Sequence, residues 1–136
     1  MIFVDTGAFL GRFVARDQYH AEASQAWEEL AHSDVQIFTS NFVVDETLTL
    51  LARRTTYDFA AARGREILGS SVLRILRPHQ DAEWEALERF EQLADQGVSF
   101  TDCVSFALMR RQRIRRVFTF DRHFRMAGFE TWPRSV

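Results

Sequence analysis

Lysine is missing from this sequence: all 17 basic residues among its 136 amino acids are arginine. Mechanisms that need a lysine amine, such as P-loop phosphate binding and Schiff-base chemistry, are therefore excluded. Cysteine is almost missing too, because Cys103 stands alone. Neither an intramolecular disulfide nor a cysteine-rich zinc site can form, which is typical of a protein of the reducing cytoplasm.

Long hydrophobic runs and linker-like segments are also lacking. No apolar run approaches the roughly 18 residues of a membrane span, and Asp5 lies where a signal peptide would be uniformly apolar. We therefore predict a cytoplasmic protein that does not contact a membrane. The two prolines and six glycines form no linker, and 46% of the residues are hydrophobic, so we expect one domain over residues 1–136. The net charge of −2 provides no overall field for attracting a polyanion.

Short apolar runs alternate with segments of helical periodicity along the chain. The expected strands are residues 2–4, 36–39, 72–76, 117–120 and 129–132, and the expected helices are residues 6–14, 20–31, 41–54, 57–68, 81–96 and 104–109. We expect Ser40 and Thr101 to cap helices, and Trp84, Leu87, Phe90 and Leu93 to be buried. The alternation predicts an α/β fold, a three-layer sandwich with a central parallel sheet and helices on both faces.

Acidic residues follow two of these strands directly, as Asp5 and Asp121. The carboxyl ends of parallel strands meet at one edge of the sheet, which is where such sheets bind ligands. Asp102 begins the apolar helix that precedes the Asp121 strand, so it is expected at the same edge. Taken singly, each acid also has an ordinary explanation as a turn residue, a cap or a partner of the helix dipole.

Glu46 is the fourth candidate, at the border between the polar and apolar faces of its helix, whereas Asp45 points toward solvent. A solvated helix flank remains an alternative for Glu46. As a set, however, the four acids would repel each other, by roughly 4 kcal/mol for two charges about 4 Å apart at an effective dielectric near 20. Oxygen ligands alone favour Mg²⁺, with Mn²⁺ as a substitute, and two such ions can clamp a phosphodiester.

Four segments that contain these acids resemble the motifs of the PIN-domain family, especially its stand-alone VapC-type toxins. The segments are IFVDTGAFL, FVVDETLTLL, SFTDCVSFALM and VFTFDRHFRMAGF, in this order and spacing. The resemblance implies a five-stranded parallel sheet with the first strand central. It also implies a Mg²⁺-dependent endoribonuclease whose catalytic and metal-binding residues are Asp5, Glu46, Asp102 and Asp121.

The resemblance implies further residues and partners. Thr6 matches a hydroxyl residue that supports the metal ligands, whereas Arg122 and His123 stand where some relatives carry another acid or amide, which leaves the number of metals open. The implied partners are an RNA substrate, a cognate antitoxin protein and a second copy of the chain in a homodimer. For substrate contacts we select Arg12, Arg16, Arg122 and His123, although His123 also fits an ordinary turn residue.

Two other function classes share features with this sequence. The stretch Asp5-Thr6-Gly7-Ala8 also resembles the active-site turn of a retroviral-type aspartic protease, but that fold is almost all strand and this sequence reads as mainly helical. A PIN domain that only binds RNA is the second alternative, and the presence of all four acids favours an enzyme instead. The residues alone do not distinguish a toxin from an RNA-processing nuclease, and the short length and lack of an extra domain resemble the toxins.

Overall fold

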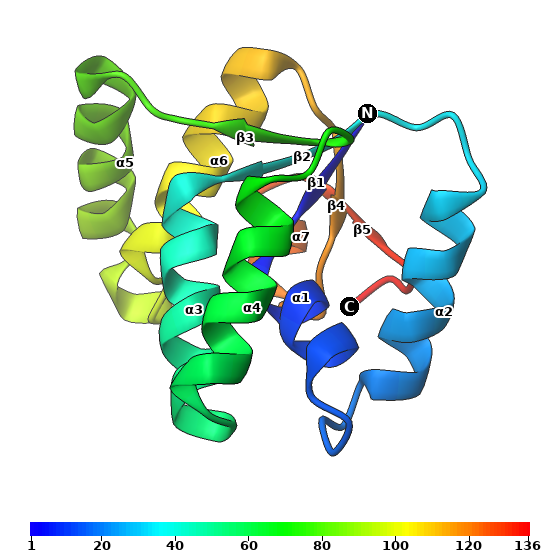
Figure 1. Ribbon diagram of the computed structural model, residues 1–136. Coiled ribbons are helices and arrows are strands. Elements are labelled where there is room, and N and C mark those ends of the chain that lie inside the picture. The colour runs from blue at the N-terminus through cyan, green and yellow to red at the C-terminus, as the bar shows by residue number, and fades with distance from the viewer.

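The computed structural model describes residues 1–136 as a parallel sheet with helices packed around it (Figure 1). The strands are β1 (Ile2–Val4), β2 (Ile37–Ser40), β3 (Leu73–Leu76), β4 (Arg116–Phe118) and β5 (Glu130–Trp132). The helices are α1 (Thr6–Phe13), α2 (His20–Ala31), α3 (Asn41–Arg54), α4 (Tyr57–Leu68), α5 (Gln80–Gln92), α6 (Phe100–Gln112) and α7 (His123–Met126), with a short 3-10 turn, η1 (Ala94–Gln96). All pairings are parallel in the order β3-β2-β1-β4-β5, which confirms the predicted fold and the central first strand.

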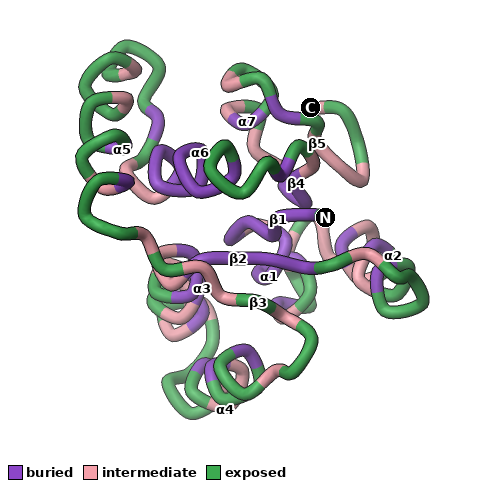
Figure 2. Tube along the Cα trace, turned by 90° about the horizontal axis from the view of Figure 1, so that it is seen from above, coloured by how far each residue is buried: buried purple, intermediate pink, exposed green.

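The central strand β1 is buried on both faces, which is why Ile2, Phe3 and Val4 read as one continuous apolar run. In Figure 2, β1 and β2 pass through the middle of the molecule, with α3 and α4 on one side and α6 and α7 on the other. The sheet is therefore covered on both sides, and the carboxyl ends of β1 and β4 are fixed next to each other inside the molecule.

Two serine caps start the helices that carry acids. The Ser40 hydroxyl accepts a hydrogen bond from the backbone N–H of Val43 at 3.1 Å, as predicted for the start of α3. The cap of α6 was predicted wrongly: the Ser99 hydroxyl accepts from the N–H of Asp102 at 3.1 Å, and Thr101 lies inside the first turn. The serine two residues earlier takes the cap because α6 begins at Phe100, and this places Asp102 in the first turn.

Helix α5 corrects the prediction of an aromatic and aliphatic face turned inward. Trp84, Leu87 and Phe90 are exposed, with 64% of Trp84 accessible to solvent, whereas the alanines Ala82 and Ala86 are buried. The small alanine side chains allow α5 to pack closely beside α6, so the larger residues are turned outward. Leu93 is half-buried against the core, as predicted. The helix ends at Gln92 and η1 follows it, before Gly97 in the left-handed conformation (φ 65°).

The segment between α1 and α2 is tied to the end of α3. Arg54 donates a hydrogen bond to Asp17 Oδ1 at 2.9 Å, and the guanidinium of Arg16 donates to the carbonyl of Arg54. These contacts hold the loop near the carboxyl end of the sheet. Separately, no helix is both long enough and apolar enough to cross a membrane.

Candidate functional site

The predicted acids line one open cavity of about 660 Å³ at the carboxyl end of β1 and β4. Asp5 follows β1 directly, Asp121 follows β4 after two intervening residues, and Asp102 comes from the first turn of α6. Glu46 reaches the cavity from α3, and Thr6 lies beside Asp5. The structure therefore brings all four acids together, from elements that are far apart in the sequence.

Asp5 is held by its neighbours across the sheet. Its backbone N–H donates to the carbonyl of Phe118 at 3.0 Å, and the Thr119 hydroxyl donates to Asp5 Oδ2 at 2.8 Å. The other carboxylate oxygen, Oδ1, is buried and has no hydrogen-bond partner, and the same holds for the hydroxyl of Thr6. Buried polar atoms normally find partners, so these two oxygens indicate a group that binds here.

The electrostatics of the cavity disfavour negative charge. Burial raises the pKa of Asp5 from 3.8 to about 7, even though the hydrogen bond from Thr119 acts in the opposite direction. Burial, and after it the charge of Asp5, raises the pKa of Asp102 from 3.8 to about 9. Asp121 and Glu46 add to both shifts through their negative charges. Without a cation, protons are therefore retained on carboxyl groups that would ordinarily be ionised.

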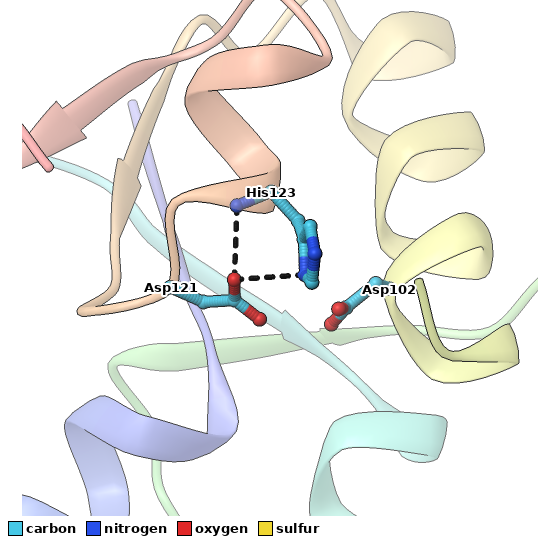
Figure 3. A group of neighbouring side chains, drawn as sticks. All are labelled: Asp102, Asp121 and His123. Atoms are coloured by element: carbon cyan, nitrogen blue, oxygen red, sulfur yellow. Dashed lines mark hydrogen bonds and ion pairs between the residues drawn. The ribbon is translucent and has the colours of Figure 1, made fainter. Parts of the chain in front are cut away.

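Asp121 is connected to His123 and faces Asp102 (Figure 3). Asp121 Oδ1 accepts a hydrogen bond from the backbone N–H of His123 at 2.9 Å and lies 3.0 Å from ring Nδ1. The other ring nitrogen of His123, Nε2, lies 3.1 Å from the carbonyl oxygen of Gln96. Three potential ligand atoms thus lie within 4.8 Å of one another: one carboxylate oxygen each from Asp102 and Asp121, and one ring nitrogen of His123.

Both ring nitrogens of His123 lie close to protein oxygens, those of Asp121 and Gln96, and His123 also lines the cavity. The oxygen set of Asp5, Asp102, Asp121 and Glu46 fits a hard divalent cation, since such ions prefer carboxylate oxygens. The unpartnered oxygens of Asp5 and Thr6 support the same conclusion.

The two neighbouring acids of α3, Asp45 and Glu46, lie in different surroundings, as predicted. Glu46 is half-buried and lines the cavity, whereas Asp45 is exposed and lies off it. Asp45 is therefore a matched surface control for substitutions of the cavity acids.

The arginines selected for substrate contacts have different positions. Arg122 lines the cavity beside His123. Arg12 lies elsewhere, with its guanidinium 5.2 Å from the Trp27 ring centroid and 5.7 Å from that of Phe13, in a separate groove. Arg16 binds the carbonyl of Arg54 and does not line the cavity. Of the three arginines, Arg122 alone lines the cavity that contains the four acids.

Several residues that line the cavity or support its acids were not identified from the sequence. Thr119 orients Asp5 and also accepts a hydrogen bond from the N–H of Asp121 at 3.0 Å, so one hydroxyl connects two acids. The sequence feature that could have identified Thr119 is its position as the one polar residue in the apolar run Val117-Phe118-Thr119-Phe120. Thr119 itself is buried behind the cavity acids, whereas Asp17, Tyr19 and Phe120 line the cavity. Nothing in the local sequence marks Asp17 or Tyr19.

Comparison with known proteins agrees with this geometry. Residues 2–130 match the sequence profile of the PIN domain. The chain is 37% identical over 129 residues to "23S rRNA-specific endonuclease VapC20" of Mycobacterium tuberculosis, covering 95% of each chain. It is 26% identical over 133 residues to a "VapC ribonuclease" of Archaeoglobus fulgidus, covering 95% of this chain and 83% of that one.

Solved structures show the same fold. The crystal structure of Mycobacterium tuberculosis VapC20, described as a Sarcin-Ricin loop cleaving toxin, superposes with a TM-score of 0.87 and 34% identity over 100% of this chain and 98% of that one. VapBC2 of Rickettsia felis, at 15% identity and a TM-score of 0.69, covers 96% of this chain and 97% of that chain and supports the fold alone. Since the family profile spans nearly the whole chain and the VapC20 identity exceeds a third, the chain belongs to the PIN-domain family.

Proposed function

We propose that this protein is a divalent-metal-dependent endoribonuclease that acts as the toxin of a VapBC-type toxin-antitoxin pair. The observation that carries the proposal is the convergence of Asp5, Glu46, Asp102 and Asp121 in one cavity, where a buried carboxylate oxygen lacks a partner. The names of its relatives, a 23S rRNA-specific endonuclease and a VapC ribonuclease, support the same activity.

The proposed metal ligands are the four acids, and the proposed ion is Mg²⁺, with Mn²⁺ as a substitute. Such an ion supplies two things when it is bound: a lower pKa for the attacking water and neutralisation of charge on the phosphodiester. The segment after Asp121 continues with Arg122 and His123 and adds no further acid to this set.

The chain's own residues hold the reacting groups in place. Thr119 fixes the orientation of Asp5 through its hydroxyl and keeps Oδ1 of that carboxylate free of other bonds. A carboxylate of the cluster accepts the proton from the attacking water, which approaches in line with the 3′ oxygen. Arg122, at the cavity rim, binds a phosphate of the RNA. No side chain is required as a nucleophile.

The substrate class we propose is structured ribosomal RNA, from the similarity to VapC20. The proposed partners are a cognate antitoxin that blocks the cavity and a second copy of the chain in a homodimer, both implied by the resemblance to VapC-type toxins. An RNA-processing nuclease outside any toxin-antitoxin pair, and a PIN module that only binds RNA, are the alternatives.

The test is cleavage of total ribosomal RNA by the purified protein, freed of any antitoxin. We expect discrete fragments in Mg²⁺ or Mn²⁺ and none in EDTA. Asp5→Asn should lower the rate by at least about 100-fold, as loss of a group that holds or orients a catalytic metal does. Asp45→Asn, which removes a neighbouring surface acid, should cleave as the wild type does. Equal cleavage in EDTA, or an active Asp5→Asn variant, would contradict the metal mechanism.

Expression in a bacterial host separates a toxin from a processing enzyme. We expect the wild-type chain to arrest growth, and Asp5→Asn to permit it at the same protein level. Growth unaffected by an active, soluble wild-type protein would favour the RNA-processing alternative.

A further inference from the structure

An aromatic pair forms part of the wall of the acidic cavity. The rings of Tyr19 and Phe120 are stacked, with centroids 4.2 Å apart and planes 4° from parallel. Both residues line the cavity that contains the four acids, and Phe120 directly precedes Asp121 in the chain. A flat aromatic surface therefore lies beside the groups that hold the proposed reaction centre.

One face of the Tyr19 ring is not covered by another ring. Phe120 is the single aromatic neighbour of Tyr19. The guanidinium of Arg134 lies 5.3 Å from the Tyr19 centroid and 6.0 Å from that of Phe120. A group on the outer face of Tyr19 would be much farther from Phe120 than from Tyr19. The similar distances therefore place Arg134 at the side of the stack, so neither another ring nor this guanidinium covers the outer face of Tyr19.

The loop that carries Tyr19 is held in place. The backbone N–H of Tyr19 donates to Asp17 Oδ2 at 3.0 Å, while Oδ1 of the same carboxylate accepts from Arg54 at 2.9 Å. Next to Tyr19, ring Nδ1 of His20 lies 2.8 Å from the carbonyl oxygen of Gly11. Because the ring is positioned before any ligand binds, little additional ordering is needed to use it for binding.

We propose that Tyr19, supported from behind by Phe120, is a stacking platform for the RNA base next to the cleaved phosphate. The inference rests on the proposed ribonuclease function. Proteins recognise unpaired RNA bases by stacking them on aromatic side chains, and an aromatic face accepts any base. The hydroxyl of Tyr19 makes no hydrogen bond to the protein, so the ring itself is the functional part. Tyr19 is a positioning residue: the stacked base places the adjacent phosphate over the acids.

The test uses a short oligoribonucleotide that spans the cleavage site mapped in ribosomal RNA. We expect Tyr19→Leu to raise KM about tenfold, the loss expected for one stacked base, with a smaller change in kcat. Tyr19→Phe should retain the wild-type KM. Tyr57→Leu is the matched control, because Tyr57 is 82% exposed and lies off the cavity.

Removal of a base from the substrate distinguishes stacking from a structural role. Replacing one nucleotide beside the cleaved bond by an abasic residue should raise the wild-type KM to that of Tyr19→Leu, and the variant should lose nothing further. Independent losses for the variant and the abasic substrate, or an unchanged KM for Tyr19→Leu, would overturn the proposal. If Tyr19→Leu fails to fold, the wild type is tested with substrates that carry an abasic residue at each position beside the cleaved bond. If none of these substrates raises the wild-type KM, the proposal is overturned.

A binding measurement keeps this proposal separate from the ribonuclease function. The cleavage-deficient Asp5→Asn protein is titrated with the same RNA, in which 2-aminopurine replaces the base beside the cleavage site. If the wild type cleaves no RNA, 2-aminopurine is placed beside the phosphate of the oligoribonucleotide at which cleavage was expected. The platform is supported, whatever the catalytic result, if the protein quenches the 2-aminopurine fluorescence, the double variant Asp5→Asn/Tyr19→Leu does not, and the double variant Asp5→Asn/Tyr19→Phe still does. Binding without quenching overturns the platform and leaves the ribonuclease function standing. Wild-type protein that neither cleaves nor binds RNA overturns both.

Discussion

Two groups of acidic residues in this protein behave in opposite ways. On α5, the acids Asp81, Glu85, Glu88 and Glu91 are exposed, and a hydrogen bond from Arg111 holds the pKa of Asp81 below its usual value. In the cavity at the carboxyl end of the sheet, burial raises the pKa of Asp5 and Asp102 instead. The residue types are the same, and the surroundings alone reverse the direction of the shift.

The difference separates acids whose negative charge is solvated from acids whose negative charge is disfavoured by burial. The α5 acids face water and arginine, so their charges cost little. The cavity acids repel one another and are poorly solvated, so in the metal-free protein they lower the free energy of unfolding. Such an arrangement is maintained where a cation compensates for it, and the comparison therefore predicts different responses of the two groups to pH, substitution and metal.

The largest expected effect is on stability as a function of pH in EDTA. Asp5 and Asp102 have raised pKa values, about 7 and about 9, so between about pH 4 and pH 9 the folded protein binds more protons than the unfolded chain. Stability must therefore fall as pH rises through this range, by up to about 1.4 kcal/mol per pH unit for each additional proton. We expect the melting temperature to drop by roughly 10 °C between pH 5 and pH 8.

Thermal unfolding of the metal-free protein across this pH range measures the drop. The double variant Asp5→Asn/Asp102→Asn should show a much flatter profile, which separates the cavity acids from the four histidines of the chain. Saturating Mg²⁺ should also flatten the wild-type profile. A melting temperature that rises from pH 5 to pH 8 in EDTA would show that the two acids are not destabilised by burial.

The second effect concerns one acid at fixed pH. Asp102→Asn removes a carboxyl group that must take up a proton on folding at neutral pH, because burial and its neighbours disfavour the ionised form. We therefore expect its melting temperature in EDTA at neutral pH to exceed that of the wild type by about 4 °C or more. In excess Mg²⁺ this gain should shrink or reverse, because metal that binds only the folded state stabilises the better-binding wild type. Cleavage activity should fall at the same time.

Asp45→Asn is the control in the same buffers, since Asp45 is exposed and lies off the cavity. If Asp102→Asn lowered the melting temperature equally in EDTA and in Mg²⁺, Asp102 would be acting as a partner of the α6 dipole and not as a metal ligand.

Local sequence pattern was sufficient to locate the acids. The apolar run Ile2-Phe3-Val4 before Asp5 predicted β1 with its observed bounds, and the fold class followed from the alternation of strands and helices. Once the sheet is parallel, the ends of β1 and β4 must meet, so Asp5 and Asp121 were predicted at one edge. The same reasoning placed Asp102, because α6 leads back to β4.

Contacts between distant segments were not predictable in this way. The bond from Thr119 to Asp5 depends on the register in which Val4 pairs with Phe118, and the Tyr19–Phe120 stack depends on how the loop between α1 and α2 folds back. The face of α5 was predicted wrongly because hydrophobicity favoured burying Trp84 and its apolar neighbours, whereas close packing beside α6 selected the alanines.

The smallest expected effect tests the exposed group. Arg111 contacts two acids of α5, with Nη1 3.0 Å from Asp81 Oδ2 and Nη2 3.6 Å from Glu85 Oε1. These side chains are largely solvated, and exposed ion pairs contribute little to stability because water and salt screen them. We expect Asp81→Asn to change the melting temperature by less than about 2 °C, equally in EDTA and in Mg²⁺, with unchanged RNA cleavage. The measurement is the same melt series used for Asp102→Asn, repeated in low and high salt, where any small loss should disappear at high salt. A metal-dependent shift for Asp81→Asn comparable to that of Asp102→Asn would mean that the two groups of acids are not distinct, and that the cavity is not the metal centre.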